Sequence, residues 1–136
     1  MINNPDSGSE DIAVVAAIYA AMAASDVSTL FDLLDPSIVV VQDDRLPWGG
    51  RHVGHDGFAK FGLVLRAHID SSVTTDALFS ADRDVVQVGR TRGRVVATGV
   101  QFDIAEVHRW TVRDGRAVAA HFSIDTQAML TALTAG

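Results

Sequence analysis

The chain contains no cysteine, so it has neither a disulfide framework nor a thiolate nucleophile, and it cannot form a cysteine-based zinc site. It also lacks an excess of positive charge: 11 lysine and arginine residues face 17 aspartate and glutamate residues, which gives a net charge of −6. A surface that binds nucleic acid needs a clear basic excess. The composition therefore argues against nucleic acid as a partner.

Long apolar runs are absent as well. The longest one, residues 12–24, is too short to span a bilayer, and the residues before it are polar and acidic rather than basic as in a signal peptide. We therefore expect a cytoplasmic protein that does not insert into a membrane. The 136 residues, of which 48% are hydrophobic and 21% charged, suit one domain that buries about two thirds of its unfolded surface.

Apolar residues at helical spacing predict four helices. Residues 1–9 show no periodicity and are expected to form a disordered leader, which leaves residues 10–136 for the single domain. In the first helix, Ile12, Val15 and Tyr19 begin a stripe that would face the core. The helices are expected over residues 10–24, 27–34, 56–69 and 126–133, the last three capped by Asp26, Asp56 and Asp125.

After Ser71 the apolar pattern changes to the alternation that is typical of strands. Residues 73–81, 85–95 and 100–125 follow it, after an earlier β-branched strand at residues 38–42. Helices followed by hairpin-connected strands indicate an α+β fold in which a strongly curved antiparallel sheet wraps around the N-terminal helices. Such a sheet would enclose a central cavity at its open end.

The hairpin of residues 100–125 contains the strongest indication of function. Its turn is Asp114-Gly115, a dipeptide that readily adopts the two positive φ angles of a type I′ turn. Alternation places Glu106 and His108 together on an otherwise apolar face, with Cα atoms roughly 6.7 Å apart, so both side chains can reach one ligand atom.

Two interpretations of this pair remain open. Burial raises the pKa of a carboxyl and lowers that of an imidazole, whereas mutual pairing opposes both shifts, so Glu106 and His108 could hold one mobile proton near neutrality. That arrangement suits general acid/base catalysis. Alternatively, the pair is structural, and Tyr19, Trp48 or a buried water satisfies its hydrogen bonds.

Several segments, taken with the order of elements, resemble the SnoaL-like branch of the nuclear-transport-factor-like superfamily. They are Asp26 after an alanine-rich helix, Leu46-Pro47-Trp48-Gly49-Gly50, Gly54-His55-Asp56-Gly57, Val107-His108-Arg109-Trp110 and Asp125-Thr126. The resemblance covers nearly all of residues 10–133. It implies a cone-shaped α+β fold, usually dimeric through the outer sheet face, whose reactions include isomerisation, polyketide cyclisation, epoxide hydrolysis and dehydration. Function in such a fold depends on the cavity side chains.

The resemblance also implies roles for three residues. Glu106 matches the position of a protonated acid that donates to a developing oxyanion in ketosteroid isomerases. His108 matches a cavity histidine of polyketide cyclases, and Tyr19 falls near the phenol donor of the isomerases. These three are the candidate catalytic residues.

The isomerase base, an aspartate on the first strand, would fall at Val41 or Gln42. Neither side chain can abstract a proton, so steroid isomerisation is disfavoured unless Asp43 or Asp44 bends inward. The other interpretation of these two aspartates is that they are exposed carboxylates where the strand ends.

Two further features lie on the predicted strands. Arg90, Arg92 and Arg94 form a basic stripe on one face of a strand, which indicates a solvated or inter-subunit face; the alternative is a site for a carboxylate or phosphate ligand. His121 alternates to the outer side of the sheet, where a contact in a homodimer is favoured over catalysis.

These observations lead to one main hypothesis. The chain would be a small-molecule enzyme of the isomerase, cyclase or hydratase/dehydratase type, acting by general acid/base catalysis on a hydrophobic, carbonyl-bearing substrate. No cofactor is required, since an acid and a base suffice, and His52 and His55 match no strong metal motif. The alternative is a non-catalytic module that binds a small hydrophobic ligand or dimerises. The residues expected to line the apolar pocket are Trp48, Phe61, Phe102, Trp110 and Phe122.

Overall fold

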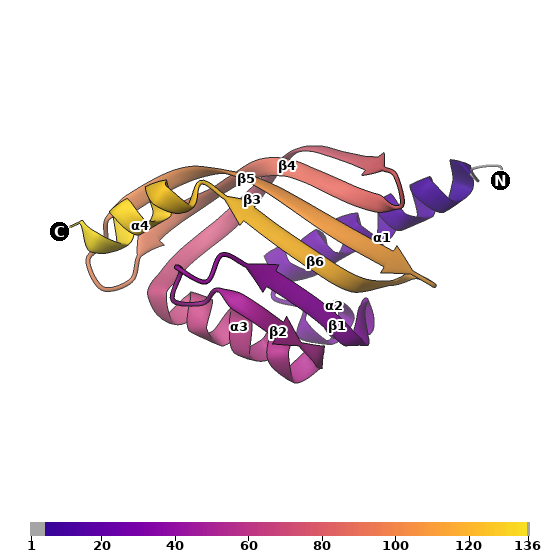
Figure 1. Cartoon of the computed structure of the whole chain (residues 1–136), viewed down its shortest axis with the longest axis horizontal. Coiled ribbons are helices and arrows are strands. Elements are labelled where there is room, and N and C mark those ends of the chain that lie inside the picture. Colours follow the sequence, from indigo (N-terminus) through magenta and orange to yellow (C-terminus); the bar gives the residue numbers. More distant parts are fainter. Residues whose placement is uncertain (1–4, 136) are drawn as a thin grey trace.

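The structure, a computed structural model, describes residues 5–135 and consists of four helices and one sheet within that range (Figure 1). The helices are α1 (Pro5–Ala23), α2 (Val27–Asp32), α3 (Gly54–His68) and α4 (Thr126–Thr134). The strands are β1 (Leu34–Gln42), β2 (Gly50–Val53), β3 (Ile69–Ala81), β4 (Asp84–Val95), β5 (Gln101–Arg113) and β6 (Arg116–Ile124).

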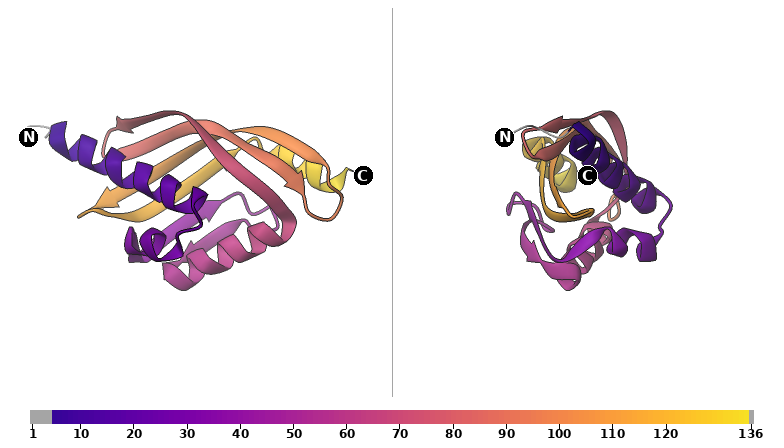
Figure 2. Two further views of the ribbon diagram at one scale, coloured as in Figure 1. Left: turned by 180° about the vertical axis from the view of Figure 1, so that it is seen from behind. Right: turned by 90° about the vertical axis from the view of Figure 1, so that its right-hand side faces the viewer.

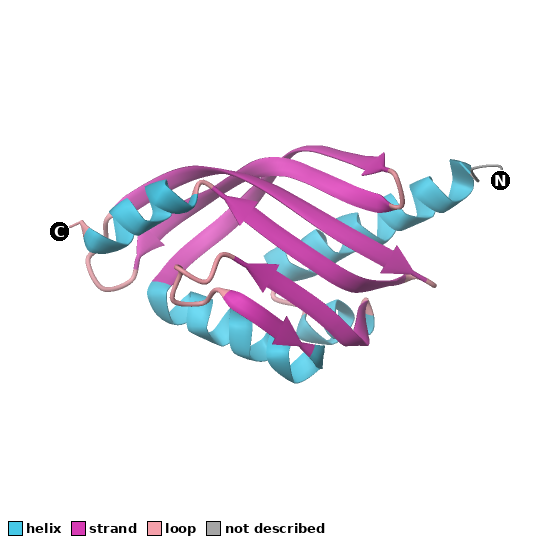
Figure 3. Cartoon of the chain, in the orientation of Figure 1, coloured by secondary structure: helices cyan, strands magenta, loops and turns pink. Residues whose placement is uncertain are grey.

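The sheet has six strands in the order β2-β1-β6-β5-β4-β3. Neighbouring strands are antiparallel, except that β1 and β6 run parallel. The sheet curves, with α1 and α3 on one side (Figures 2 and 3). Helix α4 lies at the end of the hairpin where β5 begins and β6 ends. This architecture confirms the predicted α+β fold with a curved, mostly antiparallel sheet.

The β5–β6 hairpin forms as the sequence predicts. Asp114 and Gly115 both have positive φ, 53° and 77°, as a type I′ turn requires. Along β5, exposed and buried residues alternate from Gln101 to Trp110, so the face that holds Glu106 and His108 is turned inward. Because β5 pairs with β4 on one side and β6 on the other, this face lies in the middle of the sheet.

The start of α1 differs from the prediction. The helix begins at Pro5 rather than at Glu10, so part of the predicted leader is helical, and residues 1–4 lie outside the described part of the chain. A proline suits the first helical position, because its fixed φ is already that of a helix and its missing N–H has no intrahelical partner there. The buried stripe is also rotated: Val15 and Ile18 are fully buried, whereas Tyr19 is only partly so.

Two of the three predicted helix caps are confirmed. Asp26 accepts a hydrogen bond from the Thr29 amide, and Asp125 accepts one from the Ala128 amide. The prediction for Asp56 is wrong, because α3 begins two residues earlier, at Gly54, and has no side-chain cap. Gly54 has a φ of 76°, which lets the chain turn from β2 straight into the helix.

The hydrophobic core lies between the helices and the inner face of the sheet. Fully buried side chains of this core include Ile18 of α1, Ile38 of β1, Trp110 of β5 and Met129 of α4. Within residues 5–135, no helix combines the length and the apolar character needed to cross a membrane.

Candidate functional site

Four side chains from α1 and β5 form a connected polar group inside this core. The Trp110 indole N–H donates to the Tyr19 hydroxyl oxygen at 2.9 Å, and that hydroxyl lies 2.7 Å from His108 Nδ1. On the other side of the imidazole, His108 Nε2 lies 3.3 Å from Glu106 Oε2. Tyr19 therefore joins the two candidate residues of β5 to the helix. A hydrogen bond from Tyr19 is what the alternative of a structural pair predicts, and the catalytic role of the three residues stays a prediction.

The direction of these hydrogen bonds follows from the donors. An indole N–H can only donate, so the Tyr19 oxygen accepts from Trp110 and its own proton is free for His108 Nδ1. A neutral imidazole that accepts at Nδ1 carries its proton on Nε2, which faces Glu106. The arrangement thus presents an N–H to the carboxyl of Glu106.

The carboxyl of Glu106 is buried but poorly satisfied. Glu106 is only 3% exposed, and neither of its oxygens has a hydrogen-bond partner of good geometry among the described residues. An unsatisfied buried acceptor costs about 1–3 kcal/mol, so such groups are rare unless a ligand, a water or a catalytic role explains them.

Burial shifts the proton affinity of all three ionisable groups. It raises the pKa of Glu106 to about 7, a rise that the neighbouring Gln87 carboxamide partly opposes. It lowers the pKa of His108 to about 3 and raises the pKa of Tyr19 well above its usual value. Near neutrality, Glu106 is therefore the group that can gain or lose a proton, while His108 and Tyr19 stay neutral.

Aromatic rings fill the space beside the pair. The Phe122 ring centroid lies 4.6 Å from that of His108 and 5.3 Å from that of Trp110, and Phe61 packs on Phe122 at 5.7 Å. These three residues, like Phe102, are at most 9% exposed and belong to the hydrophobic core. Of the aromatic residues predicted to line a pocket, Phe122 thus lies against His108, and Trp110 and Phe61 pack on Phe122.

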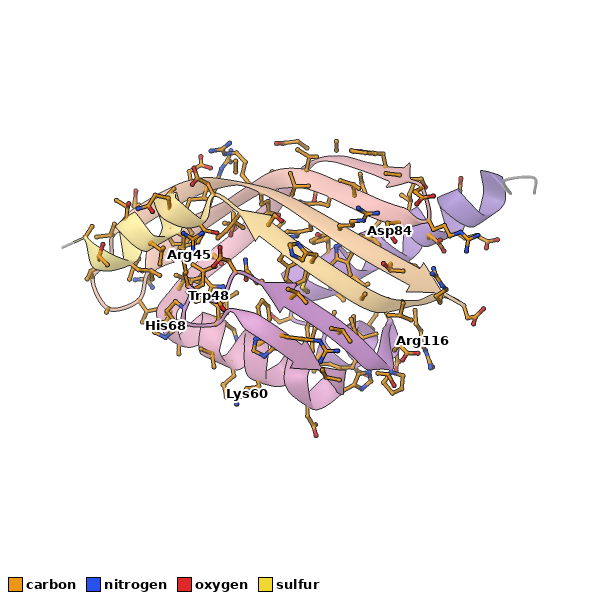
Figure 4. The ribbon with its side chains drawn as sticks, viewed as in Figure 1. Arg45, Trp48, Lys60, His68, Asp84 and Arg116 are labelled. Atoms are coloured by element: carbon orange, nitrogen blue, oxygen red, sulfur yellow. The ribbon has the colours of Figure 1, made fainter. Side chains whose placement is uncertain are left out.

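Trp48 is a core residue rather than the predicted pocket-rim aromatic. It is 2% exposed, its indole N–H donates to Gln42 Oε1 at 2.9 Å, and its ring lies 6.1 Å from that of His68. Figure 4 shows Trp48 and His68 near the end of the molecule where Arg45 also lies. The loop turns the ring inward because Gln42 offers the buried acceptor that an indole N–H requires.

Two surface hollows lie elsewhere on the described part of the chain. The first, of about 950 Å³, includes Gln42, Asp43, Arg51, His121, Phe122 and Gln127 in its lining. The second, of about 470 Å³, is lined by Asp70, Ser71, Ser72, Arg92, Gly93, Arg94, Gln101 and Phe102. Neither hollow is lined by Glu106, His108 or Tyr19.

The first strand supplies no base to the site. Gln42 is buried and bound to Trp48. Asp43 forms an ion pair with Arg45 at 2.7 Å, which holds the pKa of its carboxyl at about 2, and Asp44 is exposed. Neither aspartate bends inward, so both are carboxylates at the end of the strand.

The outer face of the sheet holds ion pairs. Arg90 and Arg92 both contact Asp103, and Arg94 lies 3.4 Å from Asp70. His121 is exposed on the same side, as predicted. Within residues 5–135, no group of three or more histidine, aspartate or glutamate side chains is arranged to hold a metal ion.

Sequence reasoning missed two buried polar residues on the inner face of β4, Gln87 and Thr91. Gln87 in β4 is fully buried, and its Oε1 has no partner in the described part of the chain. The alternation of β4 contained the signal, because Gln87 lies between Val85 and Gly89 on the face opposite to the arginine stripe. A buried amide on that face adjoins the Glu106 carboxyl.

Comparisons with known proteins agree on one fold. A family model for the SnoaL-like domain matches residues 15–120. An NTF2-like protein of unknown function from Burkholderia pseudomallei is 25% identical over 93% of this chain and 98% of its own, with a TM-score of 0.85. A presumed SnoaL-like polyketide cyclase from a Jannaschia species is 18% identical over 100% of this chain and 99% of its own, with a TM-score of 0.82.

A third structure contains a small molecule. TerC, co-crystallised with polyporic acid, is 22% identical over 93% of this chain and 99% of its own, with a TM-score of 0.83. No curated protein matches the chain.

Proposed function

Because the chain belongs to the SnoaL-like domain family, we propose that it is a small-molecule enzyme in which Glu106 transfers protons on a hydrophobic, carbonyl-bearing substrate. The reaction is of the isomerase, cyclase or hydratase/dehydratase type. Glu106 acts as the general acid/base group, and His108 and Tyr19 support it. An acid/base group whose pKa lies near the working pH is the most effective, and the Glu106 carboxyl meets this condition.

The observation that supports this proposal is the state of Glu106 itself. The carboxyl is buried, has no hydrogen-bond partner of good geometry among the described residues and faces the Nε2 of a neutral imidazole. A structural carboxylate would normally be paired, because an unpaired buried charge is costly. An unpaired carboxyl that titrates near neutrality is typical of a functional group.

The proposed step needs no oxidant or reductant. Ionised Glu106 takes a proton from the carbon next to the substrate carbonyl, and the neutral acid then returns it to another atom of the same substrate. The His108 Nε2–H stabilises the carboxylate before the first transfer and again after the second, and Tyr19 holds the imidazole in the tautomer that places a proton on Nε2. The buried surroundings strengthen these electrostatic effects.

Names of structural neighbours support the cyclase-type version of the proposal. Two of them, from the Jannaschia species and from Xanthomonas campestris, are presumed polyketide cyclases. The co-crystallisation of TerC with polyporic acid shows that a protein of this fold accepts a small organic ligand. A ligand of this general kind is consistent with the aromatic rings around His108.

A solvent-exchange experiment on a range of ketones tests the proposal. A panel of hydrophobic ketones is incubated with the protein in D₂O, and deuterium incorporation next to the carbonyl is followed by NMR. We expect Glu106→Gln to slow the exchange about 10²–10⁴-fold. Glu10 is exposed and is the only other glutamate of the chain, so Glu10→Gln is the matched control and should leave the rate unchanged. Equal rates in wild type and Glu106→Gln would refute the proposal.

A second candidate function, non-catalytic binding or dimerisation, is favoured by a specific observation. The two surface hollows are lined by neither Glu106 nor His108, and the rings beside His108 are packed closely. On the outer face, Val107 is 45% exposed, which suits contact with a second copy of the chain in a homodimer.

Ligand binding and sedimentation separate this candidate from the enzyme. If the protein is a binding module, its ligand should raise the melting temperature by the same amount in wild type and in Glu106→Gln. The rise should also be the same at each pH from about 5 to about 8. Sedimentation of Val107→Glu tests the dimer, since a charge at the centre of an interface should separate the subunits.

A further inference from the structure

Gln87 is the buried polar residue that the proposed mechanism leaves without a role. It is 0% exposed and lies on the inward face of β4, directly across from His108 in β5. Its Nε2 donates to Thr75 Oγ1 at 3.2 Å, whereas its Oε1 has no partner in the described part of the chain. A buried amide is costly unless it is satisfied, so its retention in this position needs an explanation.

A row of three residues across the sheet shows where the carboxamide of Gln87 lies. Thr75 in β3 pairs with Gly89 in β4, and Gly89 pairs with Glu106 in β5. Gly89 has no side chain, and a Cβ placed on it would stand only 2.0 Å from the Thr74 carbonyl oxygen of β3 and 2.6 Å from Gln87 Nε2. The carboxamide of Gln87 therefore occupies the space above Gly89, between Thr75 on one side and Glu106 on the other.

The second N–H of Gln87 Nε2 has a nearby acceptor in the carboxyl of Glu106. An amide NH₂ carries two hydrogens, and Thr75 Oγ1 accepts one of them. The other is directed away from Thr75 along the row, where the two oxygens of Glu106 have no donor of good geometry. A small adjustment of either side chain completes the bond.

We propose that Gln87 is a positioning residue for Glu106: anchored by Thr75 and accommodated by Gly89, its amide N–H holds the carboxyl in one orientation and favours its ionised form. The proposal rests on the proposed function in so far as Glu106 is the proton-transfer group. It adds that Gln87 sets the pH at which Glu106 exchanges its proton.

The electrostatic surroundings of Glu106 agree with this role. The ionisable groups that face it are His108 from its own strand and Tyr19 from α1. Its cross-strand partners, Gly89 in β4 and Ile124 in β6, carry no charge. The Gln87 carboxamide lowers the pKa of Glu106, in opposition to burial, so it is the neutral donor that limits how far burial raises that pKa.

Direct titration of the carboxyl tests the proposal. The chain has only two glutamates, so protein labelled with ¹³C-glutamate gives two side-chain carboxyl signals, which Glu106→Gln assigns, and the exposed Glu10 serves as an internal reference. In Gln87→Met, which keeps the length of the side chain but removes the donor, we expect the Glu106 titration midpoint to rise by about one pH unit. Thr75→Val should raise it by less, because the donor remains but loses its anchor.

Thr91→Val is the matched control. Thr91 lies on the same inward face of β4 as Gln87 and Gly89 but pairs with Ile104, one row beyond Glu106, so the Glu106 midpoint should not move. An unchanged midpoint in Gln87→Met would overturn the proposal, and so would a lower one, because it would mean that the amide presents its oxygen to the carboxyl. Thr75 is exposed, so Thr75→Val should fold; if Gln87→Met does not fold, an unchanged midpoint in Thr75→Val overturns the proposal. The titration needs no substrate, so its outcome is independent of whether the exchange experiment detects turnover.

Discussion

The two faces of β5 carry charged side chains in opposite circumstances. On the outer face, Asp103 meets Arg90 and Arg92 while all three remain at least 38% exposed. On the inner face, Glu106 is 3% exposed and has an imidazole as its nearest ionisable neighbour. Water can compensate the loss of an ion-pair partner outside, but nothing replaces it inside. Burial can therefore shift the pKa strongly only for the ionisable groups of the inner face, Glu106 and His108.

The largest expected effect is the loss of unfolding free energy when a side chain on the inner rather than the outer face of β5 is truncated. Trp110 is fully buried and donates to Tyr19, so Trp110→Ala should lower the free energy of unfolding by about 3–5 kcal/mol. Val107 lies on the outer face of the same strand and is 45% exposed, so Val107→Ala should lower it by less than about 1 kcal/mol. Urea denaturation measures both, and similar losses would contradict the assignment of the faces.

The second prediction concerns the pH dependence of stability. The pKa of Glu106 rises from 4.5 to about 7 on folding, so its contribution to stability falls as the pH rises from 4.5 to about 7. The pKa of His108 falls from 6.5 to about 3, so its contribution increases as the pH rises from about 3 to 6.5. Between pH 4.5 and 6.5 the two slopes, each about 1.4 kcal/mol per pH unit, oppose each other.

Variants that remove one of the two groups should reveal how the other changes the free energy of unfolding with pH. Glu106→Gln leaves the His108 slope, so this variant should become more stable as the pH rises from 4.5 to 6.5. His108→Gln leaves the Glu106 slope and should become less stable over the same range. Denaturation at several pH values checks both, and parallel profiles for the two variants would contradict the assignment.

The smallest expected effect concerns the outer ion pairs. Asp103→Asn removes the partner of Arg90 and Arg92, but water already solvates all three side chains. We expect the melting temperature to change by no more than about 2 °C, and the difference to vanish at about 0.5 M salt. A larger change that persists in salt would show that the outer face is more shielded than its exposure indicates.

Local patterns made much of the fold predictable. The alternation around Glu106 and the two residues Asp114 and Gly115 fixed the hairpin and its inward face, because a strand has a period of two and a type I′ turn needs positive φ. Asp26 and Asp125 were recognisable as caps, because their hydrogen bonds reach only three residues along the chain. These features depend on near neighbours in the sequence.

Features that depend on distant partners were not predictable. The Trp48 ring lies in the core against His68 of α3, and the Gln87 amide donates to Thr75 of β3. Both contacts depend on how separate elements pack together, which a single sequence does not reveal. The link from Tyr19 to Trp110 spans 91 residues, and only the packing of α1 on the sheet brings the two together. The sequence placed Glu106 and His108 together on the inner face of the strand, but it did not indicate Gln87 or the link from Tyr19 to Trp110.

The parallel pairing of β1 with β6 has a consequence for how the chain folds. Residues 39–42 of β1 find their partners at residues 119–122, so one side of β1 stays unpaired until most of the chain has been synthesised. The hairpins that join β3, β4, β5 and β6 need only local contacts and can form earlier. We therefore expect β1 to pair with β6 late in folding, in the step that joins β1 and β2 to the other four strands of the sheet.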